Sequence, residues 1–277
     1  IDLSNQIVGS VGPKQAIEKE RYHDLLFYRN RQQLICCKAS GKNLVSIPQV
    51  IRQEPLEFTA DTIGIVSPVY EHEVPHMVRD FLHNAVFHTN YFYVILTYGN
   101  RHGGAAELVK LLCKECGIRV NYINVVQMVD NWLPSFDMNE QVQLDKQEDA
   151  KIVLIKEYLA ARKNQIAVVT EADRAAHQQF LSRIRQMPKG GPCTAFYPGH
   201  GYLRWLRHLP EVCPTGSMQL REGKAVYAPN DCQTCLACVH ACPQKAIGLA
   251  VPGKNPGARY WNRHIPLQEI IAANHQA

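Results

Sequence analysis

Short runs rich in β-branched and aromatic residues alternate along the chain with longer stretches in which apolar residues recur at helical spacing. The short runs predict strands, and the longer stretches predict helices. The strands are expected at 25–28, 44–47, 62–70, 91–99 and 119–128, and the helices at 74–84, 105–116 and 146–162. Strands that alternate with helices form a parallel, doubly wound sheet, which binds ligands at the carboxyl ends of its strands. The pattern therefore predicts an α/β fold.

The rest of the chain divides by composition. A stretch at 171–187 mixes charged and apolar residues at helical spacing, which predicts a connector helix. At roughly 150 residues per domain, 277 residues are typical of two domains. We expect a leader at 1–22, a sheet domain at 23–165, a helical connector at 166–195, a cysteine-rich domain at 196–265 and a tail at 266–277.

Charge and hydropathy narrow the function classes. The chain has 30 Lys and Arg against 25 Asp and Glu, a formal charge of +5, without a long basic run. This balance does not favour nucleic acid as a partner. No apolar run approaches the roughly 18 residues of a membrane span. The first residues have neither the basic nor the apolar region of a secretory signal, so we expect a cytoplasmic protein.

The cysteines carry the strongest motif. Four of the ten are spaced C-x2-C-x2-C-x3-C-P, at Cys232, Cys235, Cys238 and Cys242 before Pro243. This is the cluster run of bacterial [4Fe–4S] ferredoxins. A zinc site is the weaker alternative because zinc sites usually combine two separated C-x2-C units. A disulfide framework is weaker still in a chain without an export signal.

A second cluster run is incomplete. In two-cluster ferredoxins the fourth cysteine of each run binds the other cluster. Cys213-Pro214 has the ending of such a run, but the three preceding cysteine positions are leucines, Leu203, Leu206 and Leu209. The printed chain therefore has one complete ligand set, namely Cys213, Cys232, Cys235 and Cys238. Cys242 is left over from the second set.

Two strand ends carry residues suited to a flavin ring. Ser67, Pro68, Val69 and Tyr70 end the third predicted strand, and Thr97, Tyr98, Gly99, Asn100, Gly103 and Gly104 follow the fourth. Glycines let the backbone approach a ring, and a tyrosine can stack on it. The same residue types also occur in ordinary loops between strands and helices. His72 and His76 are expected near this site as surface or supporting groups.

The order of these segments resembles that of the bacterial flavodoxin–ferredoxin fusion proteins. The resemblance covers about 41–265 and is carried by the two strand ends, by the Cys213-Pro214 pair, by the 232–242 run and by short matches at 45–48 and 130–134. It implies an FMN-binding flavodoxin-like domain, a small α+β ferredoxin domain with two [4Fe–4S] clusters, and cytoplasmic electron transfer, typically in anaerobes. The family's physiological substrate is generally not assigned.

The chain departs from this family where the flavin phosphate should bind. No glycine stands between residue 28 and Gly41, although flavodoxin-like proteins place a loop rich in Thr, Ser and Gly there. A one-nucleotide shift of the reading frame would restore both this loop and the missing cysteines at 203, 206 and 209. We hypothesise that 1–39 and 198–210 are out-of-frame segments. The printed chain should then lack the FMN phosphate grip and one of the two clusters.

Three functions follow from these residues. The first is electron transfer between a [4Fe–4S] cluster and a flavin, with a redox protein or a small electron acceptor as the partner. The second is a flavin-dependent reductase of a small acceptor, although no nicotinamide-binding fingerprint supports it. The third is a cofactor-deficient scaffold or a non-functional variant. A homodimer is left open.

Overall fold

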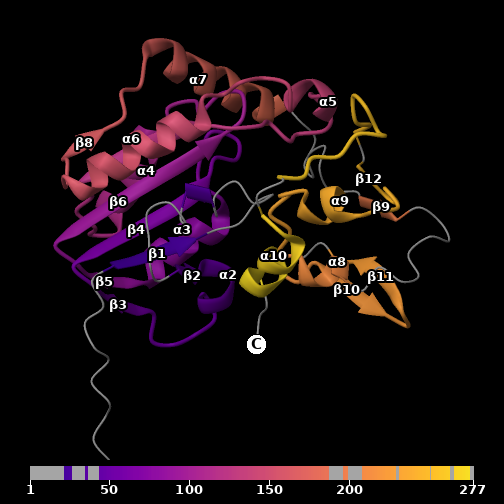
Figure 1. Cartoon of the computed structure of the whole chain (residues 1–277), viewed down its shortest axis with the longest axis horizontal. Helices are drawn as coiled ribbons and strands as arrows, with labels where there is room; N and C mark the ends of the chain where they lie inside the picture. Colours follow the sequence, from indigo (N-terminus) through magenta and orange to yellow (C-terminus); the bar gives the residue numbers. More distant parts are fainter. Residues whose placement is uncertain are drawn as a thin grey trace, which may run out of the picture.

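A computed structural model describes residues 22–26, 35–36, 44–186, 196–198, 208–228, 231–249, 251–262 and 265–274 (Figure 1). Its centre is a six-stranded sheet in the order β2-β1-β4-β6-β7-β8 in which all neighbours are parallel. The strands are β1 (Tyr22–Leu26), β2 (Leu44–Ser46), β4 (Thr62–Pro68), β6 (Tyr91–Tyr98), β7 (Tyr122–Gln127) and β8 (Gln165–Ile166). Without the short edge strand β8, this order is the flavodoxin-like 2-1-3-4-5 order, with its switch point between β1 and β4. The flavodoxin-like part of the predicted fold is confirmed.

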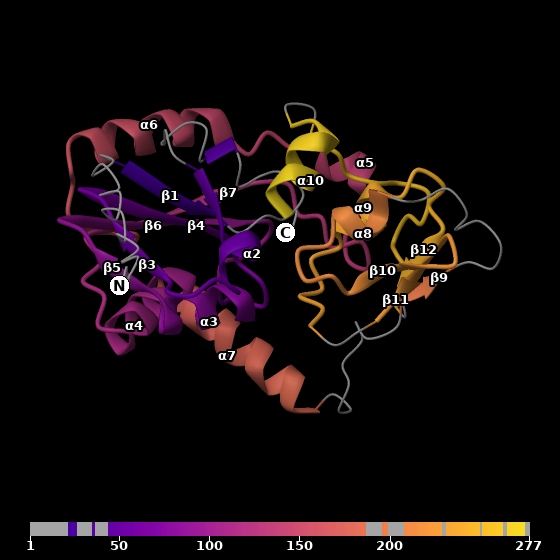
Figure 2. The ribbon, with the colours of Figure 1, turned by 90° about the horizontal axis from the view of Figure 1, so that it is seen from below.

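Helices cover both faces of the sheet. Figure 2 shows α6 (Glu148–Ala160) on one face, and α3 (His76–Asn84), α4 (Ala105–Glu115) and α7 (Glu171–Gln186) on the other. Every residue of β4 is buried, as expected for a strand enclosed by helices on both sides. One core includes Ile63, Phe81 and Phe92 on the side of α3. The second includes Tyr122 and Ile152 on the side of α6.

Most predicted elements lie within a few residues of their expected bounds. The predicted first strand, 25–28, begins earlier, at Tyr22, because β1 pairs with β4 from Tyr22 opposite Thr62 onward. The short parallel pair β3 (Glu57–Thr59) and β5 (Val86–His88) was not predicted, nor were α2 (Ile47–Val50) and α5 (Met138–Gln141). The predicted leader lies outside the described residues except for Tyr22 itself.

A second, smaller part of the molecule contains the cysteine run. We call the described residues from Phe196 to Asn262 the cysteine lobe. It holds α8 (His208–Glu211), the antiparallel pair β10 (Met218–Arg221) and β11 (Lys224–Tyr227), and α9 (Ala237–Ala241), together with β12 (Ile247–Leu249), which pairs with β9 (Phe196–Pro198). The predicted domain boundaries stay predictions.

The cysteine lobe and the sheet share a hydrophobic core. Met128 and Leu133, which follow β7, belong to the same buried cluster as Leu236 and Val239 of the lobe. The last helix, α10 (Leu267–Asn274), lies between the two parts in Figure 1 and accepts a hydrogen bond from Gln49 through the carbonyl of Ala272, at 2.6 Å. Among the described helices, none has the length and apolar character needed to cross a membrane.

Candidate functional site

The two predicted flavin loops meet at the carboxyl edge of the sheet. β4 and β6 are neighbours, with Pro68 opposite Thr97, and the N–H of Val69 donates to the carbonyl of Thr97 at 2.8 Å. Tyr70 and Tyr98 are half-buried beyond these strand ends. The structure therefore brings together the two segments that the sequence predicts to hold one ring.

Several of the predicted ligands already bond within the protein. Ser67 is fully buried, and its hydroxyl donates to the carbonyl of Pro68 at 2.9 Å. The carbonyl of Gly99 accepts from the side chain of Gln127 at 3.0 Å, and the N–H of Asn100 donates to a carboxylate oxygen of Asp130 at 2.9 Å. These bonds already engage the hydroxyl of Ser67, the carbonyl of Gly99 and the N–H of Asn100 within the protein.

The segment that should hold the flavin phosphate falls almost wholly outside the described residues. Of the stretch from 27 to 43, only Ile35 and Cys36 are described, and both are helical. Cys36 is buried, and burial raises the pKa of its thiol to about 12, with a smaller contribution from Glu148 in the same direction. The predicted absence of a phosphate grip therefore stays a prediction.

A strained turn follows β4. Tyr70 and Glu73 exchange two backbone hydrogen bonds of 2.8 and 2.9 Å, and the two residues between them, Glu71 and His72, have φ angles of 53° and 72°. Left-handed backbone costs a residue other than glycine about 1–2 kcal/mol. The ring of His72 lies directly against Gly103, where an added Cβ would stand 2.1 Å from its Cγ. Strained turns of this kind are common at functional sites.

Histidines and aromatic rings gather at this turn. The ring of His72 lies 5.6 Å from that of His177 and 4.9 Å from that of Phe180, both on α7. Burial lowers the pKa of His72, electrostatic interactions with His177, Arg101 and His102 act in the same direction, and Asp173 opposes them. Within the described part of the chain, the Nδ1 atoms of His72 and His177 have no hydrogen-bond partner. His76, in contrast, is exposed.

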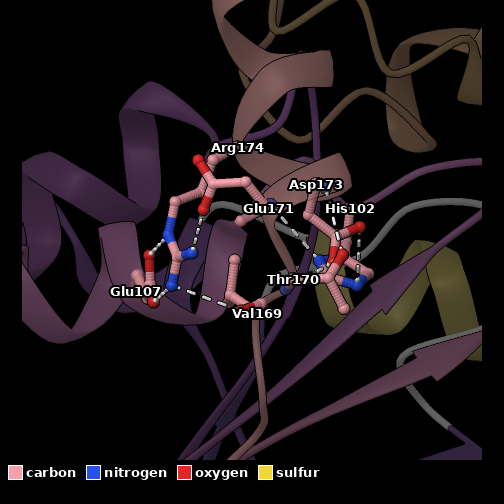
Figure 3. A network of polar contacts seen from close by, with 8 residues as sticks. His102, Glu107, Val169, Thr170, Glu171, Asp173 and Arg174 are labelled. Atoms are coloured by element: carbon pink, nitrogen blue, oxygen red, sulfur yellow. Dashed lines mark hydrogen bonds and ion pairs between the residues drawn. The ribbon is translucent and has the colours of Figure 1, made fainter.

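Polar contacts hold α7 next to the predicted flavin loops, as Figure 3 shows. Thr170 and Asp173 cap the start of the helix: the hydroxyl of Thr170 donates to the carboxylate at 2.6 Å and accepts from the N–H of Asp173 at 3.2 Å. The same carboxylate pairs with His102 at 3.5 Å. Arg174 donates two hydrogen bonds to Glu107 of α4, at 2.6 and 3.0 Å. The sequence predicted α7 as a connector but not its packing on α4.

Four cysteines line one cavity in the cysteine lobe. They are the four of the complete predicted set: Cys213, Cys232, Cys235 and Cys238. The cavity has a volume of about 310 Å³, open solvent included, and Thr215, Ser217 and Tyr227 also line it. None of the eight cysteines in the described part of the chain forms a disulfide. The structure thus brings together the four thiols that the spacing selects.

Local backbone conformation folds the cysteine run around this cavity. Thr234 and Leu236 have left-handed φ angles of 53° and 58°, which turn the chain twice between Cys232 and Cys238. The N–H of Thr234 donates to the sulfur of Cys232 at 3.4 Å, and the sulfur of Cys213 lies 3.5 Å from the hydroxyl of Thr215. Hydrogen bonds to sulfur are among the factors that set the reduction potential of an iron–sulfur centre.

One thiol of the cavity, that of Cys238, resists ionisation as the chain stands. Burial raises the pKa of Cys238 well above its ordinary value, and the nearby Cys235, Cys213 and Cys232 raise it further. Burial also raises the pKa of Tyr227, whose hydroxyl interacts with Cys232. The causes that raise the pKa of Cys238 are its burial and the other three thiols of the cavity. A bound metal centre would reverse this balance, because a coordinating thiol is deprotonated.

The remaining ligand candidates stand apart from the cavity. Cys242 is buried and accepts a hydrogen bond from the N–H of Ala246 at 3.3 Å, but it is not among the residues that line the cavity. Leu209 is fully buried, whereas Leu203 and Leu206 lie outside the described residues. In the described ranges, no group of three or more His, Cys, Asp or Glu side chains is arranged to hold a metal ion.

Known proteins offer only distant likenesses. No protein-family model matches the chain, and no curated protein matches it. A candidate flavoprotein from Bacteroides eggerthii is 12% identical over 38% of this chain and 87% of its own, with a TM-score of 0.29. The Trp repressor binding protein from Bacillus subtilis is 9% identical over 48% of this chain and 95% of its own, with a TM-score of 0.33.

Another solved structure, the rubredoxin oxygen:oxidoreductase of the anaerobe Desulfovibrio gigas, is 12% identical over 51% of this chain and 35% of its own, with a TM-score of 0.29. Such low scores carry no argument about function. The flavodoxin-like assignment rests on the strand order of the sheet itself.

Proposed function

We propose that this chain is an electron-transfer protein. In this proposal the cysteine lobe is a ferredoxin-like domain that holds one [4Fe–4S] cluster, and the carboxyl edge of the sheet holds a flavin. The observation that carries the proposal is that four thiols from two separate segments line one cavity, at Cys213, Cys232, Cys235 and Cys238.

The donor set fits an iron–sulfur cluster by its chemistry. Thiolates are the ligands that such clusters use, and here all four donors are thiols. A cluster contains its own sulfides between the irons. Its four cysteines therefore stand further apart than they would around a single ion, which lies only about 2.3 Å from each sulfur in a zinc site. Four thiols that line one cavity supply the donor set that this chemistry requires.

The two predicted cofactor sites adjoin each other. Gln233, between the first two cysteines of the run, accepts a hydrogen bond from the N–H of Met77 at 3.2 Å. Met77 lies in the first turn of α3, which follows the turn at Tyr70. When bound, a cluster supplies one-electron redox chemistry and a flavin accepts one or two electrons. This contact between the cysteine run and the helix after the Tyr70 turn supports electron transfer over an unrelated pair of binding functions.

Iron and sulfide analysis after anaerobic reconstitution tests the cluster. We expect about four irons per chain. Cys235→Ala should lose most of this iron, whereas Cys113→Ala, which removes another buried thiol, from α4, should keep it. A Cys235→Ala chain that binds as much iron as the parent would overturn the assignment, and so would a parent chain that takes up no iron.

The binding affinities of FMN and riboflavin test the proposed flavin site. If the ring loops hold the flavin and the phosphate grip is missing, the two ligands should bind with affinities within about threefold of each other, because a phosphate contact worth 1.4 kcal/mol would already give tenfold. Tyr98→Leu should weaken both ligands equally. Preference for FMN by a factor of about 100 would show that a phosphate site exists. Failure of both to bind would remove the flavin from the proposal.

A further inference from the structure

A buried histidine in the cysteine run connects the lobe to the sheet. His240 lies in α9 between Cys238 and Cys242, and only 5% of it is exposed. Its Nε2 lies 3.0 Å from the carbonyl oxygen of Asn131, in the loop after β7. Its Nδ1 accepts a hydrogen bond from the N–H of Tyr260 at 3.0 Å. One ring thus contacts the sheet part through one nitrogen and its own lobe through the other.

These two bonds fix the tautomer of the His240 ring. An Nδ1 that accepts from a backbone N–H carries no proton, so the proton of the neutral imidazole is on Nε2. Nε2 therefore donates to the carbonyl of Asn131. A phenylalanine at position 240 would fill a similar volume without either bond. A glutamine would keep one N–H donor.

Asp130 continues the connection to the predicted flavin loop. One carboxylate oxygen accepts from the N–H of Asn100 at 2.9 Å, and the other accepts from the N–H of Trp132 at 3.0 Å. Asp130 also packs against Gly99, where an added Cβ would stand 2.4 Å from the Cβ of the aspartate. Because Asp130 and Asn131 are consecutive, the bonds to His240 and to Asn100 act on the same short segment.

Other bonds also join this loop to the lobe, but from outside the cysteine run. The N–H of Lys254 donates to the carbonyl of Leu133 at 2.8 Å, and the side chain of Asn255 donates to Asp137 at 2.8 Å. His240 differs because it belongs to the helix that carries Cys238. The bonds of this ring therefore act on the same short helix that supplies Cys238 to the thiol cavity.

We propose that His240 is a positioning residue that fixes the cysteine helix against the flavin loop and so holds the two predicted cofactor sites at a constant separation. The purpose of this link rests on the proposed electron transfer. The link itself is a property of the polypeptide and can be measured without any cofactor.

Amide hydrogen exchange tests the link. In His240→Phe, the N–H groups of Asn100 and Trp132, both bonded to Asp130, should exchange roughly 10- to 100-fold faster, since the segment that holds their acceptor loses a buried hydrogen bond. The N–H of Val94, inside β6, should be unchanged. His240→Gln should restore most of the protection, because it keeps a donor for Asn131. Unchanged exchange at Asn100 and Trp132 in folded His240→Phe would overturn the proposal.

A matched control and a reciprocal variant make the test specific. The Nε2 of His208 lies 3.2 Å from the carbonyl of Ala241, so His208 contacts the same helix from within the lobe. His208→Phe should leave Asn100 and Trp132 protected; equal loss in this variant would contradict a specific role for His240. Should His240→Phe not fold, Asp130→Ala should speed exchange of the Tyr260 N–H across the interface, and no change there would equally refute the link.

Iron analysis of the same samples separates this proposal from the proposed function. A chain that binds no iron but shows the coupled exchange would refute the cluster and keep the link. A chain that binds iron without coupled exchange would refute only the link.

Discussion

Replacement of Gly103 by alanine should destabilise the protein more than its backbone angle alone explains. The φ of Gly103 is 54°, and its added Cβ would stand 2.1 Å from Cγ of His72. The angle should cost about 1–2 kcal/mol. The ring of His72 also packs against Phe180, with ring centroids 4.9 Å apart, which restricts its movement away from the added methyl group. Overpacking of this kind adds about 1–3 kcal/mol.

Gly117 is the matched control for this substitution. Its φ is 72°, and an added Cβ would meet nothing within 4 Å. Gly117→Ala therefore carries only the cost of the angle, about 1–2 kcal/mol. The free energy of unfolding, measured with urea, should fall by about 1–3 kcal/mol more for Gly103→Ala than for Gly117→Ala. Equal losses in the two variants would refute the contact between His72 and the flavin loop.

Three further predictions concern α7, the histidines and the remaining cysteine. Thr170→Ala should lower the free energy of unfolding by about 1 kcal/mol in urea titrations, while Thr170→Ser keeps the capping hydroxyl and the stability; equal losses in both would contradict the cap. Burial lowers the pKa of His72, so the unfolded chain binds a proton at this residue more readily than the folded chain does. The contribution of neutral His72 to the free energy of unfolding is therefore present above pH 6.5 and declines below it. The loss of stability between pH 7.5 and 5.5 should therefore be smaller in His72→Gln than in the parent or in the exposed control His76→Gln, and the same loss in all three would show that His72 does not titrate in this way. Cys242→Ala should keep the iron of the reconstituted parent because Cys242 does not line the thiol cavity, and loss of iron from a folded variant would place Cys242 among the ligands.

The sheet could be predicted because its central strands β4 and β6 are buried. The apolar run of β6 spans Tyr91–Tyr98 and leaves only its last residue partly exposed, so it stands out in the sequence. The strand β8 has two residues, and β3 and β5 have three each, too few to show any periodicity. β8 forms because the longer β7 offers it backbone partners, whereas β3 and β5 pair with each other, far apart in the chain.

The candidate site could be predicted in its local parts but not in its long-range contacts. The spacing of the cysteines identified the four thiols of the cavity, since three of them share one tight loop. The pairing of His102 with Asp173 joins residues far apart in the chain, and no local pattern indicates it. The same is true of His240 and Asn131. A buried histidine inside a cysteine run was the available signal, and it needed the structure to identify its partner.

X-ray absorption at the iron edge of the anaerobically reconstituted chain tests the central claim most directly. The account predicts a first shell made of sulfur alone and a second shell of neighbouring irons, both lost in a variant with Cys232 and Cys235 replaced by alanine. A first shell of oxygen and nitrogen without neighbouring irons, or a spectrum unchanged by the two replacements, would contradict the claim that these thiols hold a [4Fe–4S] cluster.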